Sequence, residues 1–447
     1  MAEAAPKYNL LLISIDTLRA DHLHCYGYDR DTSPHLDQLA KEGVLFENVT
    51  AAAPWTVPSH MSMFTALYPS VHGVVDFTRE LGEGVPTLAG CLAESGYVTA
   101  AFVTSACMNH LFGFNRGFES YDDYTVNQVV DNVEPLKHQV EATGGDWRIA
   151  TGHVITNRGT KWLTAHAHSN QKFFLFLHYF DCHYDYKPPP PYDKKFDPDY
   201  NGKENGSDIL QREADILKFI SVMDLAHMMA LYDGDIAETD ENVGKVLQLL
   251  QDLGLSEKTL VIVLSDHGEG FLEHGKIRHG NSMYEELLHV PLIMRLPGVI
   301  PAGKRVAGNV SHVDLLPTVL GLLDLPGALQ QVQGIDLSPV ILGGEPVPKR
   351  LIYSELAYHE PCLRAVRWEN HKLFGTMGTL AGAQLEELVG GRERVIANWT
   401  QLTEDSCPKD VIQAFIEGPI PIPGTTPGEV QPNTDLLQRL KSLGYTQ

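Results

Sequence analysis

Basic residues are scarce in this chain. Of its 447 residues, 34 are Lys or Arg and 57 are Asp or Glu, which gives a formal net charge of -23 at pH 7. An acidic protein repels the phosphates of nucleic acids and of anionic membrane surfaces. We therefore expect neither as a partner, and a small anionic substrate has to be attracted by a local group of positive charges.

Long apolar runs and closely spaced cysteines are missing as well. No stretch has the apolarity and the length of a membrane span, which needs about 20 residues. The first residues lack a basic segment followed by an apolar one, so we expect a cytoplasmic protein, with a secreted form whose signal peptide was removed as the alternative. The 6 cysteines are scattered without a C-x-x-C pair, which argues against a structural zinc site and a disulfide framework. No feature of the sequence predicts an oligomeric state.

Short apolar runs alternate with amphipathic segments along the chain. The expected buried strands are residues 8–16, 97–105, 172–180, 259–266, 290–296 and 350–356. The expected helices are residues 34–43, 87–96, 160–169, 224–254 and 313–325. This alternation predicts an α/β fold with a mostly parallel sheet and helices on both faces. We place the catalytic core at residues 1–345 and a small C-terminal subdomain at residues 346–447.

Two of the most apolar runs end in a carboxylate. Asp16 and Asp266 follow them directly, and ligands in parallel sheets gather at the carboxyl ends of strands. His267 comes next, with further histidines and glycines in the same loop, so this loop and Asp16 suit a divalent cation bound through oxygen and nitrogen. Each residue also has a plain structural explanation, since Asp often caps a helix and most histidines are ordinary polar residues.

Thr56 stands at the expected start of a helix. Pro58 is a good first helical residue, and Met61, Phe64 and Leu67 recur with helical spacing after it. The free N–H groups at a helix start favour an anion, such as a threonine alkoxide or a bound oxyanion. The alternative is that Thr56 merely caps the helix.

The long segment 224–254 carries a group of carboxylates that could hold a second metal ion. We expect them instead on a solvated acidic face of an amphipathic helix, and so we expect one metal ion only. The residues are Asp233, Asp235, Glu238 and Asp240.

Several ordered motifs resemble those of the sulfatase family within the alkaline phosphatase superfamily. They are ISIDTLRADHLHCYGY, WTVPSHMSMFTALYPSVHG, FLHYFDCHYDYKPPPPY, YDGDIAETDENVG, LSDHGEGFLEHG and HGNSMYEELLHVPLI. The resemblance implies an alkaline phosphatase-like fold over nearly the whole chain. It implies a metal ion held by Asp16, Asp266, His267 and Thr56, with Thr56 also the nucleophile. His183 and His279 would contact the substrate or donate a proton.

The chain departs from the sulfatase pattern at the nucleophile. Typical sulfatases carry Cys or Ser there and oxidise it to formylglycine, but threonine cannot yield an aldehyde because its β-carbon bears a methyl group. His60 stands in place of the family's arginine, and we assign it a catalytic role. A threonine at the nucleophile position is similar to the pattern of two other branches of the superfamily, the nucleotide pyrophosphatase/phosphodiesterases and the phosphoethanolamine transferases. Imidazole at His267, in place of an amide, shifts the expected metal from calcium toward zinc or manganese, with calcium or magnesium as the alternatives.

These features together predict a metal-dependent hydrolase of phosphate mono- or diesters, with phosphonate esters a related substrate class. His279, or else His183 or His274, would protonate the leaving oxygen. The alternatives are a sulfuric ester hydrolase that works without formylglycine and an inactive sulfatase-like protein that only binds a ligand. The candidates for contacts with the small anionic ester are His274, Arg19, Lys276 and Arg278.

Overall fold

The computed structural model describes residues 7–123, 151–325, 331–358, 360–389, 392–403, 406–442 and 445. Its main sheet has nine described strands: β1 (Asn9–Ile15), β2 (Val44–Thr50), β4 (Val98–Phe102), β5 (Ser120–Asp122), β6 (Phe173–Tyr179), β7 (Thr259–Ser265), β10 (His289–Val290), β11 (Leu292–Arg295) and β12 (Lys304–Ser311). Their order is β10-β2-β11-β7-β1-β6-β4-β5, and β12 pairs with β2. The centre is parallel, while β11 and β10 run antiparallel to their neighbours. The predicted mostly parallel sheet is confirmed.

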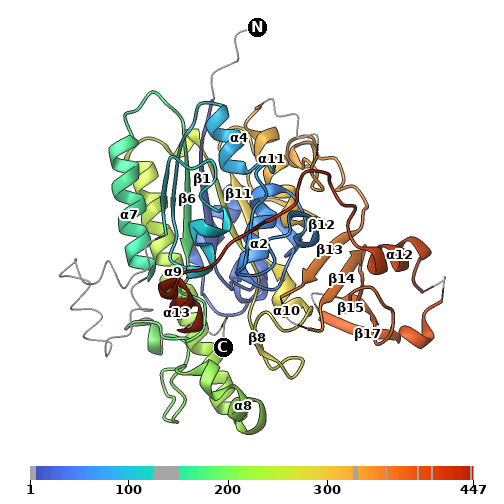
Figure 1. Cartoon of the computed structure of the whole chain (residues 1–447). Coiled ribbons are helices and arrows are strands. Elements are labelled where there is room, and N and C mark those ends of the chain that lie inside the picture. Colours follow the sequence, from blue (N-terminus) through green and yellow to red (C-terminus); the bar gives the residue numbers. More distant parts are fainter. Residues whose placement is uncertain are drawn as a thin grey trace.

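Helices cover both faces of this sheet (Figure 1). One face carries α1 (Pro34–Glu42), α7 (Thr151–His166) and α9 (Val222–Asp252), and the other carries α2 (Thr56–Thr65), α4 (Leu88–Glu94) and α11 (Leu315–Leu322). Alternate residues of β1 supply the two cores, with Leu10 and Leu12 facing α2 and with Leu11 and Ile13 facing α9. A strand buried on both faces has to be apolar at every position, which explains the unbroken apolar runs of the sequence.

A separate antiparallel sheet follows the core. It consists of β13 (Ile352–Leu356), β14 (Leu363–Trp368), β15 (His371–Thr376), β16 (Gln384–Val389) and β17 (Arg392–Asn398), with α12 (Lys409–Glu417) packed on it through Val411 and Phe415. This sheet lies within the predicted subdomain, whose boundary at residue 345 stays a prediction.

The chain then returns to the main core instead of ending beside the second sheet. Figure 1 shows the segment after α12 running back to α13 (Thr434–Ser442). On the way, β18 (Gly428–Glu429) pairs with β3 (Arg79–Glu80). Leu436, Leu440 and Tyr445 are buried in the core that contains α2. The last described residues therefore belong to the catalytic body in space.

Further described elements are α3 (Pro69–His72), α8 (Ile209–Phe219), α10 (Glu285–Leu288), β8 (Gly270–Phe271) and β9 (Ile277–Arg278). The described short helices are η1 (Ala20–His22), η2 (His24–Tyr26), η3 (Ala106–Met108), η4 (His110–Phe112), η6 (Tyr192–Lys194), η7 (Ser256–Lys258), η8 (His312–Asp314), η9 (Pro339–Gly343) and η10 (Trp399–Gln401). No helix among the described residues combines the length and the apolarity needed to cross a membrane.

The expected solvated acidic face on the long helix was wrong. The exposed fractions of Asp233, Asp235, Glu238 and Asp240 are 0, 3, 3 and 1%. They are buried because α9 is covered by other elements, and several carboxylates have polar partners there. Asp233 accepts hydrogen bonds from Tyr28 and Arg30 and lies 2.7 Å from His22 Nδ1, while Asp240 receives two backbone N–H groups of α1.

Candidate active site

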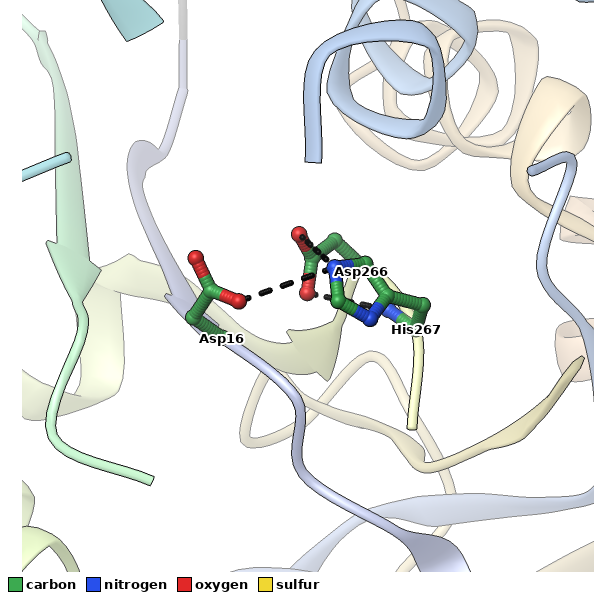
Figure 2. A group of neighbouring side chains, drawn as sticks. All are labelled: Asp16, Asp266 and His267. Carbon is green, nitrogen blue, oxygen red and sulfur yellow. Dashed lines mark hydrogen bonds and ion pairs between the residues drawn. The ribbon is translucent and has the colours of Figure 1, made fainter. Parts of the chain in front are cut away.

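The carboxyl ends of β1 and β7 place two carboxylates side by side. The strands are parallel neighbours with Ile15 opposite Ser265, so the next residues, Asp16 and Asp266, meet at the same edge of the sheet. His267 follows Asp266 directly. Figure 2 shows that Asp16 reaches from its strand toward the other two side chains, and all three are fully buried. The structure thus brings together the three side chains predicted from separate parts of the sequence.

The atoms of this cluster suit a divalent cation. His267 Nδ1 lies 2.9 Å from the Gly268 carbonyl, to which it can only donate, so Nε2 carries the lone pair. That Nε2 lies 3.6 Å from Asp16 Oδ1 and 3.3 Å from Asp266 Oδ2, and these carboxylate oxygens have no hydrogen-bond donor among the described residues. Three electron-pair donors facing one point repel each other unless a cation lies between them.

Burial raises the pKa of Asp16 to about 7, although the nearby His267 lowers it. It also raises the pKa of Asp266, as does the Asp16 carboxylate beside it. Both effects reflect the cost of placing two carboxylates in a dry site without a positive charge. A bound cation would remove this cost, so the donor set fits a metal ion.

Thr56 is the first residue of α2 and faces this cluster. Its Oγ1 lies 3.4 Å from His267 Nε2 and 3.5 Å from the hydroxyl of Tyr445. The helix begins at Thr56 rather than at Pro58, with Trp55 at the cap position, so the threonine hydroxyl is not the cap. A hydroxyl that bonds no helix N–H group is available for chemistry.

Polar side chains hold the start of α2 against the end of β7. Ser59 donates from Oγ to the Asp266 carbonyl at 2.6 Å, and His312 bridges Ser59 Oγ and the Ser265 carbonyl. Nδ1 of His60 lies 3.0 Å from the Thr56 carbonyl oxygen and 3.4 Å from Asp266 Oδ2. Its Nε2 contacts Ser14 Oγ. His60 therefore lies beside the backbone of Thr56, and its catalytic role stays a prediction.

Two further histidines lie on the other side of Thr56. His183 and His279 point their Nε2 atoms at the hydroxyl of Tyr445, at 3.1 and 3.0 Å. Their Nδ1 atoms are engaged elsewhere, by the Tyr184 carbonyl at 2.7 Å and by Glu269 Oε1 at 3.1 Å. Burial raises the pKa of Glu269 to about 8 and lowers the pKa of His279.

Comparison with known proteins identifies the family. The family model described as Sulfatase matches residues 8–325. The chain belongs to the sulfatase family. It is 25% identical over 344 residues to the uncharacterised sulfatase YidJ of Escherichia coli strain K12, a match that covers 71% of this chain and 68% of the relative. It is 28% identical over 447 residues to the steryl-sulfatase of Rattus norvegicus, covering 83% and 76%.

The fold of this sulfatase-family chain also matches solved structures. The phosphonate monoester hydrolase of Agrobacterium radiobacter superimposes with a TM-score of 0.71 at 22% identity, covering 85% of this chain and 89% of the other. Family membership makes the chain a sulfatase-like ester hydrolase. Sulfatase-family enzymes depend on a metal ion, and the cluster of Asp16, Asp266 and His267 is a possible site for one.

None of the four predicted substrate contacts forms a hydrogen bond with Thr56 in the described part of the chain. Arg19 is paired with Asp21 and Glu273, and His274 lies 2.9 Å from Glu286 Oε1 of α10. Lys276 is exposed in the turn between β8 and β9. Arg278 pairs with Glu213 and donates to Tyr184, which places it nearest to the two histidines. Their roles in substrate binding stay predictions.

Sequence reasoning missed several groups at the site. His178, on β6, places Nε2 3.3 Å from Asp16 Oδ2, and a single histidine inside an apolar strand was a signal for it. Glu269 had a weaker signal, a carboxylate two residues after His267 in a glycine-rich loop. Tyr445 had none, because nothing in its neighbourhood marks it and it lies 389 positions from Thr56 along the chain.

Proposed function

We propose that the protein is a metal-dependent hydrolase of phosphate mono- or diesters, phosphonate esters included, with Thr56 as the nucleophile. The proposal rests on the position of the Thr56 hydroxyl. It lies 3.4 Å from His267 Nε2, at the start of a helix that it does not cap. Free N–H groups at that helix start stabilise negative charge on the hydroxyl oxygen and on the ester.

The metal ion would be held by Asp16, Asp266, His267 and Thr56, with zinc or manganese favoured by the mixed oxygen and nitrogen donors. When bound, it supplies positive charge that lowers the pKa of a coordinated hydroxyl and neutralises the oxyanion. His267 is prepared for this role because Gly268 fixes its tautomer.

The chain's own residues carry the remaining steps. The Thr56 hydroxyl gives its proton to water, and the resulting alkoxide forms a bond to phosphorus while the bond between phosphorus and the leaving oxygen breaks. His279 donates the proton to that oxygen from Nε2, with Glu269 holding the ring through Nδ1. Water then cleaves the phosphothreonine, which restores the Thr56 hydroxyl and releases the acid.

Threonine chemistry favours phosphorus over sulfur. Sulfatases that use formylglycine release sulfate when the hydrated aldehyde collapses, and Thr56 cannot form an aldehyde. A phosphothreonine, by contrast, is cleaved by ordinary attack of water at phosphorus. Sulfate ester hydrolysis is the second candidate, because the curated relatives above are sulfatases in name.

The covalent intermediate tests the proposal directly. Enzyme loaded with zinc or manganese is quenched during turnover of a nitrophenyl phosphate ester, a phosphodiester and a phosphonate ester, and its peptides are mapped by mass spectrometry. We expect a phosphoryl adduct on Thr56, loss of turnover in Thr56→Ala, and partial activity in Thr56→Ser, which keeps the hydroxyl.

The matched control is Thr65→Ala, since Thr65 lies on the same helix and bonds the Met61 carbonyl instead of the site. It should turn over the esters like the wild type. Full activity of Thr56→Ala would show that water attacks the ester directly. Faster cleavage of a nitrophenyl sulfate than of every phosphorus ester would favour the second candidate.

A further inference from the structure

The hydroxyl of Tyr445 occupies the space between the nucleophile and the two histidines. It lies 3.0 Å from His279 Nε2, 3.1 Å from His183 Nε2 and 3.5 Å from Thr56 Oγ1. In the reaction proposed above, the oxygen of the departing alcohol has to approach the same Nε2 atoms while its phosphorus approaches Thr56. The tyrosine oxygen and the leaving oxygen therefore compete for one position.

The tyrosine is held there by the surrounding core. Its ring packs among aromatic side chains, with ring centroids 6.0 Å from Trp55 and 5.7 Å from Phe77. Tyr358 donates a hydrogen bond to the Tyr445 carbonyl, and Tyr445 is 8% exposed. These contacts define where the side chain lies while the last described residues are docked on the core.

The helix before Tyr445 is attached by a small apolar contact. Leu436 and Leu440 of α13 are buried, while Leu437 on its outer side is 42% exposed. A nine-residue helix is marginal by itself, and two leucines contribute only a few kcal/mol of burial. The segment made of α13 and Tyr445, here called the closing segment, can therefore leave the core without unfolding the main sheet.

The reacting groups are inaccessible while the closing segment is in place. Thr56 is 0% exposed, His183 3% and His279 5%. An ester large enough to contact Thr56 and both histidines cannot enter a site this covered. Tyr445 contributes to the cover and also uses the polar atoms that the leaving oxygen needs.

We propose that the closing segment is a displaceable cover of the site and that the Tyr445 hydroxyl is an internal competitor of the leaving group. The inference rests on the proposed function for the roles of His183 and His279. Substrate binds after Tyr445 withdraws. Its apparent affinity is therefore the affinity of the open state multiplied by the fraction of molecules that is open. The side chain controls access and takes no part in the bond changes.

Steady-state kinetics of the metal-loaded full chain distinguish a competitor from a proton donor. With a nitrophenyl phosphate ester, Tyr445→Ala should lower KM and raise kcat/KM about tenfold, because two hydrogen bonds and the ring contact of the closed state are lost. Its kcat should stay near the wild-type value. Tyr445→Phe keeps the ring and should give a smaller rise, and Leu437→Ala, on the outer side of the same helix, should match the wild type.

A fall of kcat in both Tyr445→Ala and Tyr445→Phe would overturn the proposal, since it would make the hydroxyl a proton donor or a substrate contact. Wild-type KM in both variants would also overturn it. If the wild type and every variant were inactive on all esters, the proposed function would fail, and the cover would be judged by thiol labelling alone.

Cys107 provides that labelling test. It is 0% exposed on η3, and burial raises the pKa of its thiol while a hydrogen bond with Tyr445 lowers it. A small thiosulfonate reagent should label Cys107 at least tenfold faster in Tyr445→Ala and in Leu440→Ala than in the wild type. Cys182 and Cys407 are buried elsewhere and serve as internal controls that should not change. Equal protection of Cys107 in all three proteins would show that the segment does not cover the site.

Discussion

At the scale of single residues, the hydrogen bond made by Nδ1 of a histidine directs the ring and determines the role that Nε2 can take. Glu269 engages Nδ1 of His279, and the Tyr184 carbonyl engages Nδ1 of His183, so in each ring Nε2 is directed into the site. The Gly268 carbonyl accepts from Nδ1 of His267 and leaves its Nε2 lone pair for a metal ion. The same ring type is thus a candidate ligand in one place and a candidate proton donor in another.

His279→Ala should slow alkyl phosphate esters much more than nitrophenyl esters, because a poor leaving group needs a proton and a good one does not. A general acid contributes about 10²–10⁴-fold, so the loss on the alkyl ester should lie in this range. Rates on both esters, measured at saturating metal, check it. Equal losses on the two esters would make His279 a substrate contact only.

His72 gives a pH dependence that is separate from the metal cluster. Burial lowers its pKa from 6.5 to about 3, and its Nδ1 accepts a hydrogen bond from the Val74 N–H group. As the pH falls below 6.5, the unfolded chain binds a proton that the folded chain does not, so the stability of the fold decreases. The decrease should be about 2 kcal/mol between pH 6.5 and pH 5.

The measurement is the free energy of unfolding in urea at pH 7.5 and pH 5. His72→Asn keeps an acceptor for Val74 and cannot titrate, so its loss on acidification should be smaller than that of the wild type by about this amount. The exposed His168→Asn should behave like the wild type. An unchanged pH dependence in His72→Asn would show that this imidazole is protonated in the folded state.

At the scale of elements, buried carboxylates of α9 fix the helices around it. Asp240 accepts from the backbone N–H groups of His35 and Leu36 at 3.0 and 2.9 Å, so it caps α1 from another helix. The residue that usually caps, Ser33, makes no such bond. The acidic pattern of the long helix therefore serves packing between helices and not contact with solvent.

Asp240→Ala should destabilise the protein by about 1–2 kcal/mol, because two N–H groups at the start of α1 lose their acceptor. Urea unfolding at pH 7.5 measures the change, and hydrogen exchange should show faster opening at residues 35–36 than elsewhere in the core. Asp252→Ala, at the exposed end of the same helix, is the control. Equal effects of both substitutions would mean that the capping bonds add no stability.

At the scale of the whole molecule, the candidate metal site connects strands that lie 250 positions apart. Asp16 follows β1 and Asp266 follows β7, and the parallel register of the two strands brings them together. In the unfolded chain these ligands are far from each other. Metal binding should therefore stabilise the folded state as a whole.

A chelator should lower the melting temperature of the metal-loaded wild type by several degrees, since at 100 times the dissociation constant a ligand adds about 2.7 kcal/mol. Asp266→Ala and His267→Ala should lose most of the bound metal by elemental analysis and should no longer respond to the chelator. Asp252→Ala should respond like the wild type. Full metal retention in both site variants would disprove the ligand assignment.

The sequence by itself determined the fold class and the candidate metal donors. Buried parallel strands have to be apolar throughout, so the carboxylates that end them stand out, and the helical spacing after Pro58 places Thr56 at a helix start. That threonine cannot form an aldehyde is also a property of the residue alone. Each of these inferences depends on chemistry or periodicity within a few neighbouring residues.

The tertiary structure alone decided which side chains meet across long distances. The acidic residues of α9 are buried because other helices cover them, and Tyr445 reaches Thr56 because the chain returns from the second sheet to the main core. Local periodicity gives the face of an element on which a residue lies, but the element packed against that face is set by the whole chain. The contact between Tyr445 and Thr56 could be seen only once that packing was known.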